Sequence, residues 1–159
     1  MKLTYDNIVK WFDVYFDTFN KNQGDFDTVP AIAKYFLPDL EFWGYNALGK
    51  RPSNKEELLM TMIHPGLHEH LTPREYIIDL KKLIIVVQFQ VQFTDEPSGK
   101  VWPAKQTSTH YHLVQDEKGD LKIKKILYFM EHRPASEGDY KVLWAKYREQ
   151  AVAARGKKK

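Results

Sequence analysis

The sequence lacks several features that would place a protein in a particular class. It contains no cysteine, so a disulfide framework and thiol chemistry are excluded, and a reducing compartment suits it. No apolar run approaches the roughly 20 residues that are needed to span a bilayer. The first ten residues lack the uninterrupted apolar segment of a signal peptide. We therefore expect a cytoplasmic protein with no membrane partner.

The chain also lacks an excess of basic charge outside its C-terminus. Its formal net charge is +3, from 24 basic and 21 acidic residues. Removing the four basic residues of the C-terminal tail leaves 20 basic against 21 acidic residues; these four are Arg155, Lys157, Lys158 and Lys159. A nucleic-acid-binding domain carries its basic patch on the folded part. We therefore expect no nucleic-acid partner and interpret the tail as a solvated chain end.

Aromatic residues, in contrast, are plentiful at 14% of the chain, and two of them stand in the most regular segment of the sequence. Over residues 86–93, apolar residues at odd positions alternate with Gln88, Gln90 and Gln92. This period of two predicts a strand with one face toward a core. Over residues 83–87 every position is apolar, which predicts that both faces are covered there. The segment is about twice the usual strand length, and we expect a long, bent antiparallel sheet around it.

The remaining patterns predict helices on either side of a run of strands. Apolar residues at three- and four-residue steps indicate amphipathic helices over 4–20 and 136–154, and shorter helices are expected over 29–36 and 53–63. Strands are expected over 39–45, 69–80, 83–94, 101–115 and 121–131. This order indicates an α+β fold, in which three N-terminal helices cover one face of a curved, mostly antiparallel sheet and enclose a conical cavity.

The C-terminal helix is expected to be an interaction element. We predict a domain over residues 1–134, followed by a helix and basic tail over 135–159. The helix carries an apolar stripe that we expect to pack on the cone or across a dimer; it consists of Tyr140, Leu143, Trp144 and Tyr147.

Spaced segments of the chain carry a resemblance to a known family. They are the end of the first helix at 18–26, the step into the first strand at 35–42, the step into the third helix at 49–53, and the closing hairpin at 119–129. Through these segments, residues 4–133 resemble the nuclear transport factor 2-like superfamily and, within it, the SnoaL-like group. The resemblance implies a cone-shaped apolar pocket between helices and sheet, and a homodimer formed through the outer face of the sheet.

Histidine is the candidate for chemistry, because it is the usual general acid–base side chain near neutral pH and the chain has no cysteine. Two enzyme groups of this family can be compared with the chain. Where the ketosteroid isomerases have their Asp base, this chain has Trp43 or Gly44. The first catalytic histidine of the scytalone dehydratases corresponds to His70. The Tyr-Asp pair of the dehydratases is replaced by Phe19-Asn20. We therefore predict that His70 is the catalytic residue and that it lies on a strand that enters the cavity.

For the strand expected over residues 101–115, the sequence allows either face to point into the pocket. One register places His110 and His112 in the pocket, together with Trp102 and Ser108, and makes His110 a second catalytic candidate. The other register places Thr107, Thr109 and Tyr111 there and sends both histidines to the dimer face. A zinc site that combines His70 with this pair is a sharper alternative, but we predict no metal and no cofactor.

These residues together predict a pocket for a small apolar or aromatic ligand. The side chains that we expect to line it are Tyr15, Phe19, Tyr35, Trp43, His64, Phe89, His112 and Tyr128. The first hypothesis is a small-molecule binding protein with possible cofactor-free isomerase, dehydratase or cyclase activity. The alternative is a non-catalytic dimerising or ligand-binding module, in which aromatic side chains fill the cone and no titratable group reaches it.

Overall fold

The computed structural model describes residues 2–44, 51–131 and 134–157, of which 134–139 are described by their backbone alone. Along these residues the elements follow in the order α1 (Tyr5–Asn20), α2 (Pro30–Ala33), β1 (Phe36–Trp43), α3 (Lys55–Thr61), β2 (Leu67–Asp79), β3 (Ile84–Asp95), β4 (Lys100–Val101), β5 (Lys105–Gln115), β6 (Leu121–Met130) and α4 (Pro134–Gly156). The predicted strand end at Tyr45, the turn from Gly49 and the side chain of His132 lie outside the described residues.

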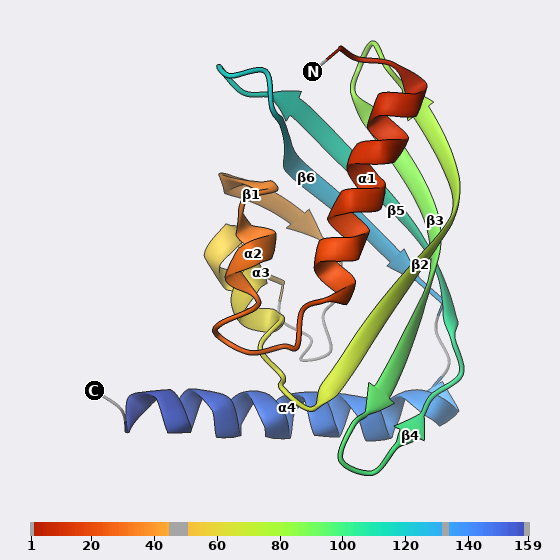
Figure 1. Ribbon diagram of the computed structural model, residues 1–159. Coiled ribbons are helices and arrows are strands. Elements are labelled where there is room, and N and C mark those ends of the chain that lie inside the picture. The colour runs from red at the N-terminus through yellow and green to blue at the C-terminus, as the bar shows by residue number, and fades with distance from the viewer. Residues whose placement is uncertain (1, 45–50, 132–133, 158–159) are drawn as a thin grey trace.

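The strands form one mixed, curved sheet in the order β1-β6-β5-β3-β2, and β4 pairs with β3 beside it. Strand β1 runs parallel to β6, whereas the other pairs are antiparallel. Irregular pairing between Pro73 and Glu75 and between His112 and Leu113 bends β2 and β5. Helix α1 crosses the concave face, and α2 and α3 lie near β1 (Figure 1). The predicted α+β cone is confirmed.

The organising strand alternates as predicted. In β3 the side chains at odd positions from Ile85 to Phe93 are buried, while the glutamines between them face outward. Helix α1 covers this inner face because its apolar residues recur on one side: Ile8, Phe12, Tyr15, Phe16 and Phe19 are all buried. Its start is fixed by Thr4, whose side chain accepts a hydrogen bond from the Asn7 amide at 3.2 Å.

Two predicted elements have different boundaries. The second helix ends at Ala33, and β1 already begins at Phe36 and continues through Pro38. Proline is tolerated there because β1 is an edge strand that pairs on one side only. The strand expected over 101–115 is interrupted after Val101, so that β4 and β5 are separate and Trp102 and Pro103 lie between them.

Helix α4 runs across one end of the cone (Figure 1). Tyr140 is buried and stacks on Phe93 of β3 with ring centroids 4.4 Å apart. Trp144 donates from its indole nitrogen to the Thr61 carbonyl at 2.8 Å, and the Tyr147 hydroxyl donates to Asp95 Oδ1 at 2.7 Å. The predicted packing of the α4 stripe on the cone is therefore confirmed.

Candidate functional site

A cavity of about 400 Å³ lies between the concave face of the sheet and the helices. It is lined by Tyr15, Phe19, Phe42, Leu58, Thr61, Met62, Glu69, Phe93, Tyr111, Ile126, Tyr128, Met130, Glu131, Tyr140, Lys141 and Trp144. Most of these side chains are apolar or aromatic. The volume is in the range of about 300–1,000 Å³ that is typical of small-molecule sites.

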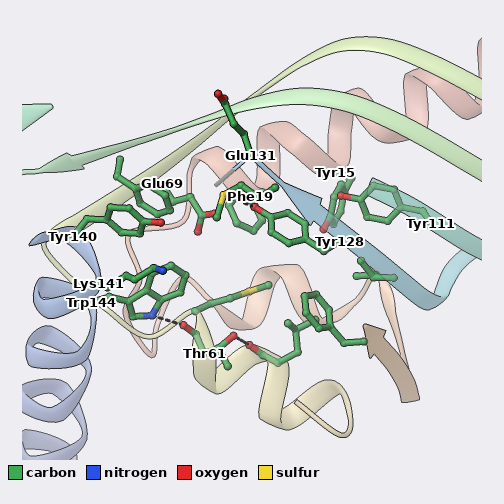
Figure 2. A pocket seen from close by; sticks show the side chains of 16 residues that line it. Tyr15, Phe19, Thr61, Glu69, Tyr111, Tyr128, Glu131, Tyr140, Lys141 and Trp144 are labelled. Carbon is green, nitrogen blue, oxygen red and sulfur yellow. Dashed lines mark hydrogen bonds between the residues drawn. The ribbon is translucent and has the colours of Figure 1, made fainter. Parts of the chain in front are cut away.

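Glu69 is the acidic side chain at the centre of this cavity (Figure 2). It points inward from β2, opposite Phe93 of β3. Burial among apolar side chains raises the pKa of Glu69 from its ordinary 4.5 to about 7, because desolvation disfavours the charged carboxylate. The carboxyl is therefore half ionised near neutral pH, which is where a general base is most useful.

The strand that carries Glu69 is held in place by the end of α1. The side-chain amide of Asn20 donates to the Leu71 carbonyl at 2.8 Å, and its oxygen accepts from the Leu71 amide at 2.8 Å. Asn20 thus imitates a neighbouring strand on the free edge of β2, two residues from Glu69. This pair of bonds fixes the position of the carboxyl relative to the aromatic helix α1.

Tyrosines surround the carboxyl. Figure 2 shows the hydroxyl ends of Tyr128 and Tyr140 near Glu69, with Tyr15 and Tyr111 farther along the cavity. Burial raises the pKa of Tyr128 well above its ordinary value, and the nearby charge of Glu69 adds to this effect. Tyr15 and Tyr111 pack against each other with ring centroids 6.0 Å apart, and burial raises the pKa of both. These hydroxyls stay protonated and can donate to a ligand.

The structure brings three of the predicted aromatic residues to the cavity wall: Tyr15, Phe19 and Tyr128. Tyr35 and Phe89 are buried in the core beside it, where the Tyr35 hydroxyl bonds to Thr18 Oγ1 at 2.9 Å. Trp43 lies on the outer face with 46% of its surface exposed. Its ring is covered by the guanidinium of Arg51, whose central carbon lies 3.5 Å from the ring centroid.

The histidines expected in the pocket lie elsewhere, which corrects the prediction for His70, His110 and His112. On β2 the inward positions are Leu67, Glu69 and Leu71, so His70 points out of the sheet and is exposed. On β5 the buried positions are the odd-numbered ones from 105 to 113, so His110 and His112 share the outer face with Ser108. The register left open by the sequence is thus the one that places Thr107, Thr109 and Tyr111 inward.

His64 is buried but does not line the cavity either. Its Nδ1 donates to the Leu67 carbonyl at 2.9 Å, and its ring packs on Trp144 of α4 with centroids 4.5 Å apart. Burial lowers the pKa of His64 from 6.5 to about 4, so the imidazole is neutral at physiological pH. The role of His64 in this structure is to support the docking of α4.

Two further findings concern classes of site. Among the residues that the structure describes, no three His, Asp or Glu side chains come together as a metal site, so the zinc alternative has no geometric support. Within the same residues, no helix is both long and apolar enough to cross a membrane. The cytoplasmic location and the boundary at residue 134 stay predictions.

Sequence reasoning missed Glu69, because it lies between two histidines that drew attention as acid–base candidates. The signal that could have found it is the alternation Leu67, Glu69, Leu71, in which a carboxylate occupies an apolar position of a strand. An acid at an inward-facing strand position is costly to bury, which makes it a candidate for a functional site.

Comparisons with known proteins identify the fold. ActVI-ORFA from Streptomyces coelicolor superposes with a TM-score of 0.61 at 10% identity, over 81% of this chain and 98% of that one. Nuclear transport factor 2 from Cryptosporidium parvum gives 0.60 at 16% identity, over 82% and 99%. A protein described as a SnoaL-like polyketide cyclase, from Jannaschia sp. CCS1, gives 0.58 at 11% identity, over 82% and 89%.

These likenesses define the class: the chain has the nuclear transport factor 2-like, or cystatin-like, cone fold. Within this class the SnoaL-like proteins are among its structural neighbours, and the predicted resemblance is confirmed at the level of the fold. No model of a protein family matches the sequence, and no curated protein does.

Proposed function

We propose that this protein binds a mainly apolar, ring-containing small molecule in the cone cavity and transfers a proton on it without a cofactor, by isomerisation, dehydration or cyclisation. Glu69 is the general base. The observation that carries the proposal is the carboxyl of Glu69 at the centre of an aromatic cavity, with its pKa raised to about 7. Structural neighbours described as a polyketide cyclase and as a ketosteroid isomerase-like protein support it through the fold.

The carboxyl has the properties that proton transfer requires. A base whose conjugate acid has a pKa near the working pH is ionised often enough to act, yet is stronger than an ordinary carboxylate. The tyrosine hydroxyls around it can donate to an oxygen of the ligand, and the apolar wall strengthens such hydrogen bonds by excluding water. The purely aromatic, filled cone of the alternative hypothesis would offer no such group.

The test uses a ring ketone with acidic C–H bonds, beta-tetralone, in deuterium oxide. We expect the protein to accelerate exchange of the hydrogens next to the carbonyl, followed by proton NMR. Glu69→Gln should slow the exchange about a hundredfold, which is the usual contribution of general base catalysis. The rate should rise with pH toward a plateau above about pH 7, because the carboxylate is the active form.

Glu131→Gln is the matched control, since Glu131 also lines the cavity but its carboxyl points away from the other side chains in Figure 2. It should leave the exchange rate within about twofold of the wild-type rate. Equal exchange rates with the wild type and Glu69→Gln proteins would refute Glu69 as the base.

We also propose that the outer face of the sheet packs against a second copy of the chain. One row of cross-strand neighbours runs over this face from β2 to β1; it consists of Ile77, Val86, His110, Leu127 and Trp43. Cross-strand neighbours point to the same side of a sheet, so the row forms an apolar stripe with one histidine in the middle. Ile77 at one end and Trp43 at the other are 55% and 46% exposed.

Analytical ultracentrifugation tests this surface. Ile77→Asp places a charge on the stripe at a position already exposed, so the monomer should fold normally while the dimer dissociates. Val142→Asp on α4 is the control, because Val142 is 66% exposed and lies off the sheet. A wild-type protein that sediments as a monomer would exclude the homodimer.

A further inference from the structure

The hydroxyl of Tyr128 has a weak hydrogen-bond partner. Tyr128 and Met130 lie two residues apart on β6, so their side chains leave the same face of the strand, and both line the cavity. The Tyr128 hydroxyl donates to the Met130 sulfur at 3.3 Å, and a thioether sulfur is a weak acceptor. Among the residues that the structure describes, no other acceptor bonds to this hydroxyl.

The carboxyl of Glu69 lies near this hydroxyl and does not bond to it. Figure 2 shows both groups at the centre of the cavity, and the charge of Glu69 acts on Tyr128. In the described part of the chain, no group forms a hydrogen bond or an ion pair with the carboxyl, and burial alone raises its pKa. Polar groups in apolar surroundings are normally paired, and exceptions call for an explanation. Two neighbouring exceptions in one cavity indicate that both groups serve a ligand.

The surroundings of Tyr128 hold its ring in place. The ring packs on Phe42 of β1 and Phe89 of β3, with centroids 6.3 and 6.4 Å away. The backbone of Tyr128 pairs with Thr109 of β5, inside the sheet. Rotation of the hydroxyl about its own C–O bond turns the hydrogen away from the sulfur without moving the ring. A change of hydrogen-bond partner therefore requires little rearrangement.

An oxygen on a ligand competes well with the Met130 sulfur for this hydrogen. A carbonyl or hydroxyl oxygen is a stronger acceptor than a thioether, and the apolar wall strengthens the bond by excluding water. The ligand oxygen gives up hydrogen bonds to water when it enters, so the net gain is modest. A ligand without an oxygen leaves the bond between Tyr128 and Met130 intact and gains nothing from it.

We propose that Tyr128 and Met130 select ligands that carry a ring carbonyl or hydroxyl, because the Tyr128 hydroxyl exchanges the Met130 sulfur for the oxygen of the ligand. Tyr128 contacts the ligand, and Met130 is a positioning residue that holds the hydroxyl in the free protein. The bound oxygen lies beside Glu69, so the neighbouring C–H bond is the one presented to the base. This inference rests on the proposed function, because it requires that the cavity bind a ring compound.

The experiment compares beta-tetralone with tetralin, which has the same ring system without the carbonyl. Binding of each compound to the full chain is measured by titration calorimetry. Tyr128→Phe keeps the ring on Phe42 and Phe89 and removes only the hydroxyl. It should weaken binding of beta-tetralone about fivefold and leave binding of tetralin within about twofold of wild type. Tetralin thus reports whether the variant still forms the cavity.

Met130→Leu should have the opposite effect, since leucine has a similar volume and no acceptor. The Tyr128 hydroxyl then has no sulfur to bond in the free protein, so the ligand oxygen gains more and beta-tetralone should bind about threefold more tightly. In a protein that already carries Tyr128→Phe, Met130→Leu should have no such effect. Tyr147→Phe is the matched control: it removes a hydroxyl bonded to Asp95 outside the cavity and should change neither affinity.

The outcomes separate this inference from the proposed function. If wild-type protein does not bind beta-tetralone, the proposed ligand site is wrong and the selection by Tyr128 is overturned with it. If beta-tetralone binds, but Tyr128→Phe weakens it no more than Tyr147→Phe does or weakens tetralin equally, the selection alone is wrong. Unchanged or weaker binding of beta-tetralone in Met130→Leu overturns the exchange of partners. A selective loss in Tyr128→Phe with a gain in Met130→Leu supports the inference.

Discussion

Replacing Glu69 by glutamine should make the protein more stable as well as less active, and the gain should depend on pH. Because the folded state raises the pKa of Glu69 from 4.5 to about 7, it holds the proton more tightly than the unfolded chain. The contribution of Glu69 to stability is therefore fully present below about pH 4.5 and is lost as the pH rises through 7. Glutamine has the same shape and no charge, so it suffers no such loss.

The expected size follows from the change in proton affinity. At about 1.4 kcal/mol for each tenfold change, a pKa of about 7 in place of 4.5 corresponds to an upper limit of about 3.5 kcal/mol. The carboxyl keeps partial contact with solvent through the cavity, which screens some of this cost, so about 2 kcal/mol is the working value. Glu69→Gln should gain this much in unfolding free energy above about pH 8, relative to about pH 4.5.

His64 has the opposite pH dependence in nearly the same window. Its pKa is lowered from 6.5 to about 4, so its contribution to stability is full above pH 6.5 and is lost as the pH falls toward 4. In the wild-type protein the two effects oppose each other between about pH 4.5 and 6.5. We expect a nearly flat stability profile there, and a profile that falls with acid in Glu69→Gln.

Urea unfolding, followed by tryptophan fluorescence from about pH 5 to 8.5, measures the free energies by linear extrapolation. The quantity of interest is the difference in unfolding free energy between Glu69→Gln and wild type at each pH. An effect of the amide that does not depend on pH shifts this difference by a constant and leaves its change with pH unaltered. A difference that does not change with pH would refute the reasoning, because Glu69 would then titrate as an ordinary exposed acid. Glu131→Gln, measured in parallel, controls for removing one negative charge.

Two further predictions concern the supports of the site. Asn20→Ala removes both hydrogen bonds to the Leu71 backbone and should cost about 2 kcal/mol of stability. Faster hydrogen exchange of the Leu71 amide would confirm that the edge of β2 has opened. Unchanged exchange would contradict the role of these two hydrogen bonds in holding β2. Truncation after Pro134 removes Tyr140 and Trp144, which line the cavity. The free energy of unfolding in urea should therefore fall by at least about 3 kcal/mol, and binding of beta-tetralone should be abolished. Retained stability and binding would show that α4 is not part of the cone.

The sequence predicts the orientation of an element correctly where a pattern repeats over many residues. It fails where a single position decides which face of a strand points into the cavity. Eight alternating residues make the orientation of β3 predictable, and helix α1 repeats its apolar positions over the whole of its length. In β2, a shift of one residue exchanges His70 for Glu69 at the cavity, and only Leu67 and Leu71 on either side reveal the correct choice. The orientation of β5 depended on pairing with β3, a long-range contact that local patterns do not contain.

The parallel pairing of β1 with β6 has a consequence for how the protein is made. Phe42 pairs with Ile126, 84 positions later in the chain, and both line the cavity. At about 5–20 residues per second, a ribosome needs roughly 4 to 17 seconds to synthesise the intervening chain. During this time β1 has no partner strand. The aromatic face of α1 is also uncovered until the sheet has formed. The hairpins of the sheet form from local contacts, whereas the cavity needs strands far apart in the sequence and can be completed only after β6 has been synthesised.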